Sequence, residues 1–342
     1  MAPLRILYVG GTGTISWSCV KRSVAVGHDV AVLNRNRTVA RRPLPGGVEV
    51  LEADFVEAES VERAIRGRHF DAVVNFISFR PDQAERAIEL FVERTEHYVH
   101  ISTAALYQKP PRRVPYLEST ARSSPTSTYA TEKIAAEDVL SEAYATRGFP
   151  VTVVRPSHTY DDAHPPIPGD WTVIDRMRRG DEVVVHGDGT SLWTVTHAED
   201  FALGLVGLLG NPQTRGEAFH ITSDFLYSWN QLYTMVAAAI GVVPRIVHVP
   251  TDLLRAGAPD WFWSELIEGD LQYSVLLDNS KIRSYVPEFA PKVHFAEGAR
   301  RIAAWRAEHP DVAVGDPSLD AVFDRLVRGY HLAEDAFRSL AP

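Results

Sequence analysis

Tyr129 and Lys133 lie four residues apart in a stretch of helix-forming residues. Residues i and i+4 share one face of an α-helix, so this spacing can bring the ammonium group near the phenol. A fixed positive charge favours the phenolate and lowers the pKa of the phenol, which is about 10 in a free tyrosine. A tyrosine tuned in this way can move a proton at an alcohol or sugar hydroxyl near neutral pH. The alternative is a tyrosine and a lysine on a solvent-exposed helix face.

A glycine-rich turn near the start of the chain indicates a phosphate site. Gly10, Gly11 and Gly13 lie between a short apolar run, residues 5–9, and a helix-like segment. Glycine permits a tight turn and the close approach of a pyrophosphate, and the helix N-terminus offers free N–H groups to the anion. Ser16 takes the third glycine position of a GxxGxxG pattern, where a small residue preserves close packing. The alternative is a plain strand-to-helix turn.

The elements that position these residues alternate between strand and helix. Short apolar runs predict strands at residues 5–9, 29–33, 48–52, 71–75, 98–102 and 151–155, with helices between them at about 14–26, 60–65, 83–94 and 129–145. This alternation predicts an α/β fold, a Rossmann-type doubly wound parallel sheet that binds ligands at the carboxyl ends of its strands. We expect a dinucleotide-binding domain in residues 1–160 plus about 197–225. A smaller mixed substrate-binding lobe is expected in about 161–196 and 226–342.

Composition and charge exclude several classes of protein. The chain has 342 residues and a formal net charge of −9, which disfavours binding to nucleic acid or to an anionic membrane. A single cysteine, Cys19, suits a reducing compartment, and no apolar run reaches the length of a membrane span, so we expect a cytoplasmic protein. Asp161, Asp162 and His164 lie close in sequence but have no further ligand cluster beside them, so we expect no metal.

The end of the second predicted strand bears on the choice of cofactor. An acidic residue there would bind the 2′-hydroxyl of an adenosine ribose, but this chain has Asn34, Arg35, Asn36 and Arg37. Arginine can hold a 2′-phosphate through a charge-assisted contact. The sequence therefore favours NADP(H) and leaves NAD(H) open, unless this segment is a solvated basic loop.

In their order along the chain, these residues resemble the extended short-chain dehydrogenase/reductase family, also called the NAD-dependent epimerase/dehydratase family. The resemblance extends to about Trp305. The motifs that carry it are Gly10-Gly-Thr-Gly13-Thr-Ile-Ser16, Asp54-Phe55, Asn75-Phe-Ile-Ser78, Ser102-Thr103-Ala-Ala-Leu-Tyr107, Tyr129-Ala-Thr-Glu-Lys133, Arg155-Pro156, Gly187-Asp-Gly189, His197-Ala-Glu-Asp200 and Asp278-Asn-Ser-Lys281.

The resemblance implies a role for each matching residue. Tyr129 would be the acid/base, Lys133 would bind the nicotinamide ribose, and Thr103 would hydrogen-bond the substrate oxygen. Asp54 and Phe55 would flank the adenine. The remaining residues expected at the dinucleotide are Gly10, Gly13, Thr14, Ile15, Asn34, Arg35, Arg37, Phe76, Ile77, Ser78, Arg80 near the phosphates, Ser102, and Pro156 and His158 beside the nicotinamide. His158 is a candidate second acid/base, or a residue that only hydrogen-bonds substrate or backbone.

One departure from the family pattern argues against a dehydratase. Family dehydratases typically follow the hydroxyl residue with Asp-Glu, which act as acid and base in water elimination. Here Thr103 is followed by Ala104 and Ala105, and neither can transfer a proton. A carboxylate from a loop, Asp161 or Asp162, remains an alternative.

A second departure concerns the substrate. Family members that act on nucleotide-diphosphate sugars usually hold the diphosphate with two arginines, and this chain has Trp193 and, at about the second position, Ile267. An indole cannot replace a guanidinium as an anion ligand. We therefore expect a substrate other than an ordinary nucleotide-diphosphate sugar, with Trp193 as a stacking face. The alternative places Trp193 in the core and gives the diphosphate to another arginine: Arg176, Arg178, Arg179 or Arg245.

Three functions compete at this point. The first is an NAD(P)-dependent epimerase that acts on a sugar-like secondary alcohol through a transient ketone. The second is an NADPH-dependent ketoreductase or alcohol dehydrogenase of a nucleoside or natural-product pathway. The third is a non-catalytic RNA-associated relative, which the acidic charge and the intact Thr103, Tyr129 and Lys133 disfavour. The resemblance also implies a homodimer that pairs through the helices at about 83–94 and 129–145, with a small molecule as the substrate.

Overall fold

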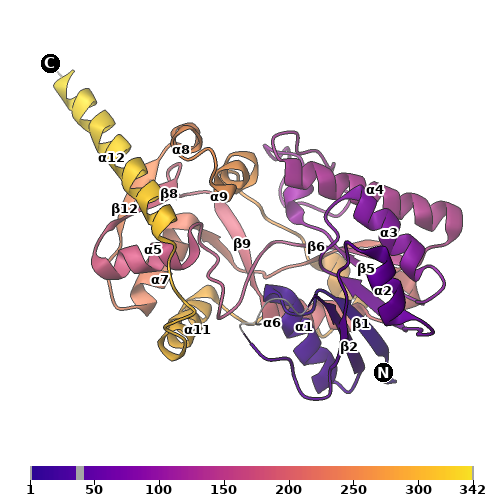
Figure 1. Ribbon diagram of the computed structural model, residues 1–342. Coiled ribbons are helices and arrows are strands. Elements are labelled where there is room, and N and C mark those ends of the chain that lie inside the picture. The colour runs from indigo at the N-terminus through magenta and orange to yellow at the C-terminus, as the bar shows by residue number, and fades with distance from the viewer. Residues whose placement is uncertain (1, 36–41, 341–342) are drawn as a thin grey trace.

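Seven parallel strands form the central sheet of the molecule (Figure 1). The computed structural model describes residues 2–35 and 42–340, and within them the strand order is β3-β2-β1-β4-β5-β6-β10. The strands are β1 (Arg5–Val9), β2 (Asp29–Asn34), β3 (Glu49–Glu52), β4 (Ala72–Asn75), β5 (Tyr98–Ile101), β6 (Val151–Pro156) and β10 (Ala218–Ile221). The α/β class and the doubly wound parallel sheet predicted from sequence are therefore confirmed.

Helices cover both faces of this sheet, because successive strand residues point to opposite faces. Leu7 and Val9 of β1 pack in one core with three helices, and Ile6 and Tyr8 pack in the other with three more. The first set is α2 (Ala58–Ile65), α3 (Pro81–Phe91) and α4 (Thr128–Arg147), and the second is α1 (Thr14–Ala25), α6 (Ala198–Leu208) and α10 (Ser280–Tyr285). The central sheet is thus covered on both faces, and its parallel strands end at a common edge.

The rest of the chain builds a smaller, mixed part. Its two small sheets have the orders β11-β9-β7 and β12-β8. The strands are β7 (His158–Tyr160), β8 (Glu182–His186), β9 (Leu192–His197), β11 (Leu226–Ser228) and β12 (Arg245–Val249). The helices are α5 (Asp170–Arg179), α7 (Trp229–Ala239), α8 (Thr251–Gly257), α9 (Phe262–Leu266), a π-helical turn (Ile267–Leu271), α11 (Phe295–Glu308) and α12 (Pro317–Ser339). The exact division of the chain into two domains stays a prediction.

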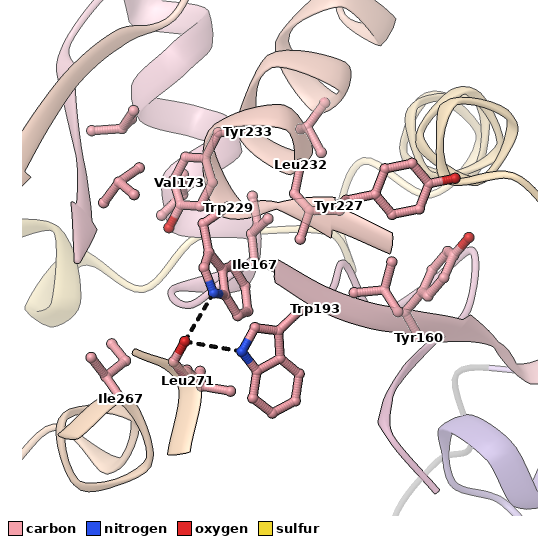
Figure 2. Packing of buried hydrophobic residues seen from close by; sticks show 14 of the residues in the cluster. Tyr160, Ile167, Val173, Trp193, Tyr227, Trp229, Leu232, Tyr233, Ile267 and Leu271 are labelled. Carbon is pink, nitrogen blue, oxygen red and sulfur yellow. Dashed lines mark hydrogen bonds between the residues drawn. The ribbon is translucent and has the colours of Figure 1, made fainter. Parts of the chain in front are cut away.

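A tryptophan pair marks the core of this smaller part (Figure 2). The indole nitrogens of Trp193 and Trp229 both donate to the carbonyl of Leu271, at 3.0 and 3.1 Å. Trp193 also donates to the carbonyl of Tyr273 at 2.9 Å, and its side chain is 2% exposed. Two buried indoles thereby fix the π-helical turn against β9 and α7.

The last helix, α12, runs along the smaller part and then extends away from the body of the molecule (Figure 1). Over the residues that the structure describes, no helix combines the length and the apolar character that a membrane span requires.

Candidate active site

A cleft of about 820 Å³ follows the carboxyl ends of the central strands. It brings together residues from both ends of the first half of the chain, as the parallel topology requires. Those of its lining residues that the sequence singled out are Gly10, Gly13, Thr14, Ile15, Asn34, Arg35, Asp54, Phe55, Phe76, Ile77, Ser102, Thr103, Tyr129, Lys133 and Pro156. One continuous crevice therefore holds both the glycine turn and the tyrosine–lysine pair.

The glycine turn has the close backbone packing that a dinucleotide cradle needs. Gly10 has φ +85°, and a Cβ there would lie 2.6 Å from Cγ2 of Ile77. A Cβ at Gly11 would lie 2.7 Å from Val32. Gly13 precedes the first residue of α1 and adds no side chain at the helix N-terminus, where its own N–H donates to the hydroxyl of Ser16 at 2.8 Å. These residues fit the pyrophosphate of a nicotinamide dinucleotide.

The adenosine end of the cleft follows β2 and β3. Asn34 and Arg35 line it after β2, and Asp54 and Phe55 line it after β3. The carboxylate of Asp54 accepts a hydrogen bond from the backbone N–H of Val56 at 3.1 Å, which holds this turn in place. Arg37, the other arginine expected there, lies outside the described residues.

The opposite end of the cleft carries the groups that could move a proton. Ser127 caps α4 by accepting a hydrogen bond from the N–H of Ala130 at 3.3 Å, so Tyr129 lies in the first helical turn and Lys133 one turn further. Thr103 follows β5, and its hydroxyl accepts from the N–H of Ala105 at 3.2 Å. The hydroxyl of Thr103 also lies close enough to the phenol of Tyr129 to lower its pKa. A substrate oxygen placed between these two hydroxyls would contact both.

Lys133 is buried and held by the backbone. Its ammonium donates to the carbonyls of Ser78 and Ile101, at 2.8 and 2.7 Å, and lies 4.5 Å from the ring centre of Phe79. Burial lowers the pKa of Lys133 to about 7, although the charge of Glu137 acts in the other direction. The side chain is thus only partly protonated at neutral pH.

The pKa of Tyr129 departs from the expectation based on sequence. Burial raises the pKa of Tyr129 above its ordinary value, the hydrogen bond from Thr103 lowers it, and the charge of Asp270 raises it. The expectation that Lys133 would lower the pKa of this phenol is wrong for the structure described here, because Lys133 is bound to two carbonyls and is itself close to losing its proton. Tyr129 is therefore a neutral phenol near pH 7.

Asp270 forms a buried ion pair close to this site. Its carboxylate lies 2.6 Å from the ammonium of Lys109, and the two side chains are 7% and 4% exposed. The charge of Asp270 influences the pKa values of Tyr129 and His158, so it lies within electrostatic reach of the reactive end. The pair connects the loop after β5 to the π-helical turn of the smaller part.

Four residues expected at the site lie elsewhere. Ser78 is buried, and its carbonyl oxygen accepts a hydrogen bond from Lys133. Arg80 lies on the surface and forms an ion pair with Asp82 at 2.9 Å. His158 packs against Trp193, Trp229 and Trp263, and its Nε2 lies 3.0 Å from the carbonyl of Pro166. Of the four, Trp193 lies deepest in the hydrophobic core, which is the alternative that the sequence left open.

The environment of His158 makes it a poor acid/base. Burial lowers the pKa of His158 to about 4, while the carbonyl of Pro166 and the charge of Asp270 raise it less. The ring is therefore neutral at physiological pH and packs among indoles. A role in hydrogen bonding suits it better than proton transfer.

The two loop carboxylates considered for a dehydratase are already engaged. Asp161 is buried between Arg42 and His164, and Asp162 lies 3.1 Å from His197 and 3.0 Å from Arg301. Ala104 and Ala105, which follow Thr103, are buried. In residues 2–35 and 42–340, no cluster of three or more His, Cys, Asp or Glu could hold a metal ion.

Several lining residues escaped the sequence analysis. Phe79 covers Lys133, and its ring centre lies 6.2 Å from that of Tyr129. Gln83 and Leu44 line the cleft, and Ser157 and Thr159 line its substrate end. Ser157 directly follows the Arg-Pro motif, so its position after a strand was a usable signal, whereas nothing in the sequence marks Leu44.

Known proteins resemble this chain over most of its length. The family model "NAD dependent epimerase/dehydratase family" matches residues 6–222. The 2'-dehydrokanamycin reductase of Streptomyces kanamyceticus is 28% identical over 94% of this chain and 90% of its own length. A chloroplast stem-loop binding protein of 41 kDa from Arabidopsis thaliana is 25% identical over 71% of this chain and 65% of its own length.

A solved structure shows the same fold. The dTDP-glucose 4,6-dehydratase DesIV of Streptomyces venezuelae, solved with NAD and TYD bound, has a TM-score of 0.73 at 21% identity, over 90% of this chain and 98% of its own. The family match covers more than half of the chain, and the cleft fits a dinucleotide. The chain is therefore an enzyme of the extended short-chain dehydrogenase/reductase type that belongs to the NAD-dependent epimerase/dehydratase family.

Proposed function

We propose that this enzyme reduces a ketone on a sugar-like ring to a secondary alcohol, with NADPH preferred over NADH. The observation that carries the proposal is the placement of Tyr129 and Thr103 together at the reactive end of the cleft, where burial raises the pKa of the phenol. A phenol with a raised pKa keeps its proton at neutral pH, and reduction needs a proton donor. A nicotinamide cofactor supplies the hydride when it is bound.

Each residue at the reactive end of the cleft then has its own role in the reduction. Thr103 and Tyr129 hold the ketone oxygen, and Tyr129 donates its proton to that oxygen as the alcohol forms. Lys133, fixed by the carbonyls of Ser78 and Ile101, presents its remaining hydrogen-bonding capacity to the cleft beside Tyr129. Phe79 shields this end from water, because its ring lies over both Lys133 and Tyr129.

The substrate we propose lacks a nucleotide diphosphate. Trp193 and Ile267, which stand where diphosphate-binding relatives have arginines, are 2% and 1% exposed. Two of the candidate replacements are engaged elsewhere: Arg176 pairs with Asp320 at 2.5 Å, and Arg245 pairs with Glu182 at 3.3 Å. Without charge-assisted contacts of about 1.5–3 kcal/mol each, diphosphate binding would be weak.

A natural-product ketone fits these properties. The Streptomyces kanamyceticus relative is named for reducing 2'-dehydrokanamycin, and it matches nearly the full length of this chain. A net charge of −9 would also attract a cationic amino sugar at long range. NADPH is favoured because Arg35 lines the adenosine end of the cleft, where an acidic residue would instead select NADH.

Epimerisation and RNA binding have less support. An epimerase must first remove a proton from an alcohol, and the raised pKa of Tyr129 works against a phenolate base. The likeness to a stem-loop binding protein covers 71% of the chain, but the net charge of −9 disfavours a nucleic-acid surface.

Purified enzyme tests the proposal directly. We expect consumption of NADPH with 2'-dehydrokanamycin or a comparable keto sugar. In Tyr129→Phe, we expect kcat to fall at least about a hundredfold with cofactor affinity retained, because general acid catalysis typically contributes 10²–10⁴. Conversion of UDP- or dTDP-hexoses with tightly retained cofactor and no net use of NADPH would establish an epimerase instead. Micromolar binding of UDP or dTDP by calorimetry would overturn the substrate assignment.

A further inference from the structure

The C-terminal helix α12 carries an unbroken pattern of apolar residues at alternating intervals of four and three. The pattern runs through Leu319, Phe323, Leu326, Tyr330, Ala333, Phe337 and Leu340. This spacing forms one stripe along a helix and is the repeat by which helices pair with one another in coiled coils. The stripe is continuous in the sequence, so we expect each part of it to pack against another apolar surface.

Only the first half of the stripe has a partner within the molecule. Phe323 and Leu326 are 0% and 5% exposed and belong to the core of the smaller part. Phe337 and Leu340, at the other end, are 75% and 79% exposed. The helix extends beyond the body at this end (Figure 1), and Tyr330 and Ala333, in between, are half-buried, so the part of the stripe without a covering element in the described chain is its end.

A groove lies beside the exposed half of α12. It has a volume of about 870 Å³ and is lined by Val249, Pro250, Leu253 and Gly257 on one side and by α12 from Arg325 to Arg338 on the other. Leu253 on its rim is 55% exposed. A Cβ at Gly329, which lines the groove from α12, would meet no atom within 4 Å. The groove is thus open, apolar and close to the protruding side chains of the same helix.

The charges at the rim favour a neutral occupant. Glu334 lies 2.7 Å from Arg338 and 3.4 Å from His331 on the same helix, and Arg325 is the other charged lining residue. Both signs are present, so a two-fold axis can bring basic side chains of one copy toward acidic ones of the other. A strongly acidic or strongly basic partner would find no matching patch here.

We propose that the exposed half of α12 is a homodimer interface, in which the end of α12 from a second copy occupies this groove. Each copy offers both a protrusion, Phe337 and Leu340, and a cavity that can receive it, which is what an isologous two-fold contact requires. Ala333, the small residue midway along the exposed half, lets the two helices approach closely. The long-range repulsion between two chains of net charge −9 is screened within about 8 Å at physiological ionic strength.

This interface is separate from the pairing through α3 and α4 that the family resemblance implies, and it does not depend on the proposed reductase activity. Neither the cleft nor Tyr129 contributes to it. A variant that separates the subunits can therefore keep an intact active site.

The test is the oligomeric state of the full chain, followed by light scattering and sedimentation over a dilution series at physiological salt. We expect the wild type to associate through α12, as a dimer or, where α3 and α4 also pair, as a tetramer. Phe337→Glu should raise the dissociation constant at least about a hundredfold, because it places a charge in the centre of the contact. Leu332→Glu is the matched control: Leu332 is on the same helix and 65% exposed, but it lies off the stripe and outside the groove.

A second variant separates dimerisation from folding. Gly329→Leu places a side chain in the groove from a position where an added Cβ meets no atom within 4 Å, and it removes a glycine from a helix interior, so it should leave the monomer at least as stable while blocking the second copy. A monomeric wild type would overturn the proposal. So would a state of association that both Phe337→Glu and Gly329→Leu leave unchanged, since the copies would then associate through another surface only, and so would a loss of association in Leu332→Glu.

Discussion

Replacing Gly10 by alanine should damage both stability and cofactor binding, and Gly27 provides the control. Gly10 and Gly27 have nearly the same backbone conformation, with φ +85° and +89°. A left-handed φ costs an alanine about 1–2 kcal/mol at either position. At Gly10 the new methyl group would also lie 2.6 Å from Cγ2 of Ile77, whereas at Gly27 it meets nothing within 4 Å. Overpacking of this kind adds about 1–3 kcal/mol.

Urea unfolding of the two variants isolates the contact with Ile77. We expect Gly10→Ala to be less stable than Gly27→Ala by about 1–3 kcal/mol, since the backbone term cancels. Calorimetric titration with NADPH should show affinity at least about tenfold weaker in Gly10→Ala, because the displaced turn no longer lets a pyrophosphate approach the backbone. Gly27→Ala should bind NADPH like the wild type. Equal stability of the two variants, with unchanged affinity in both, would refute the role assigned to this turn.

Three further outcomes follow from the charged residues of the site. Burial lowers the pKa of Lys133 to about 7, so between that value and about 10.4 the unfolded chain binds more protons. The free energy of unfolding of the wild type should therefore rise with pH across this window by up to a few kcal/mol. Urea unfolding of Lys133→Met at the same pH values should show no such rise. The same pH dependence in both proteins would contradict this prediction. Lys109→Met should cost about 3–5 kcal/mol by leaving Asp270 buried and unpaired, and adding Asp270→Leu should restore much of the loss; a double variant no more stable than the single one would count against this account. In Arg35→Ala, KM should rise for NADPH and stay constant for NADH, whereas equal changes would remove the case for a 2′-phosphate contact.

Local sequence patterns predicted the sheet because its strands are short, apolar and bounded by glycine or polar turns. Residues 5–9 were predicted as a strand and form β1 with the same limits. The segment of about 197–225, expected in the dinucleotide-binding domain, contains β10, which pairs with β6 of the central sheet. The helix expected from 83 begins at Pro81, since proline is well suited to the first helical turn.

The chemistry of the site depended on contacts that no local pattern records. The spacing of Tyr129 and Lys133 on one helix could be predicted, but the partners of Lys133 are carbonyls 55 and 32 residues away in sequence. Burial, which sets both pKa values, is likewise a property of the assembled sheet. Arg80 is the opposite case, because its partner Asp82 lies two residues away and could have been considered.

The shared carbonyl of Leu271 has a consequence for protein engineering. A library that reinstated arginine at Trp193, in order to make the enzyme accept nucleotide sugars, would remove one of the two indole donors to that oxygen and the donor to the carbonyl of Tyr273. The same substitution would place a guanidinium among the rings of His158 and Trp229, which pack against Trp193 in the hydrophobic core. Altered specificity at this end should therefore require coordinated replacement of the whole turn, and single-site screens there should return unfolded or inactive clones.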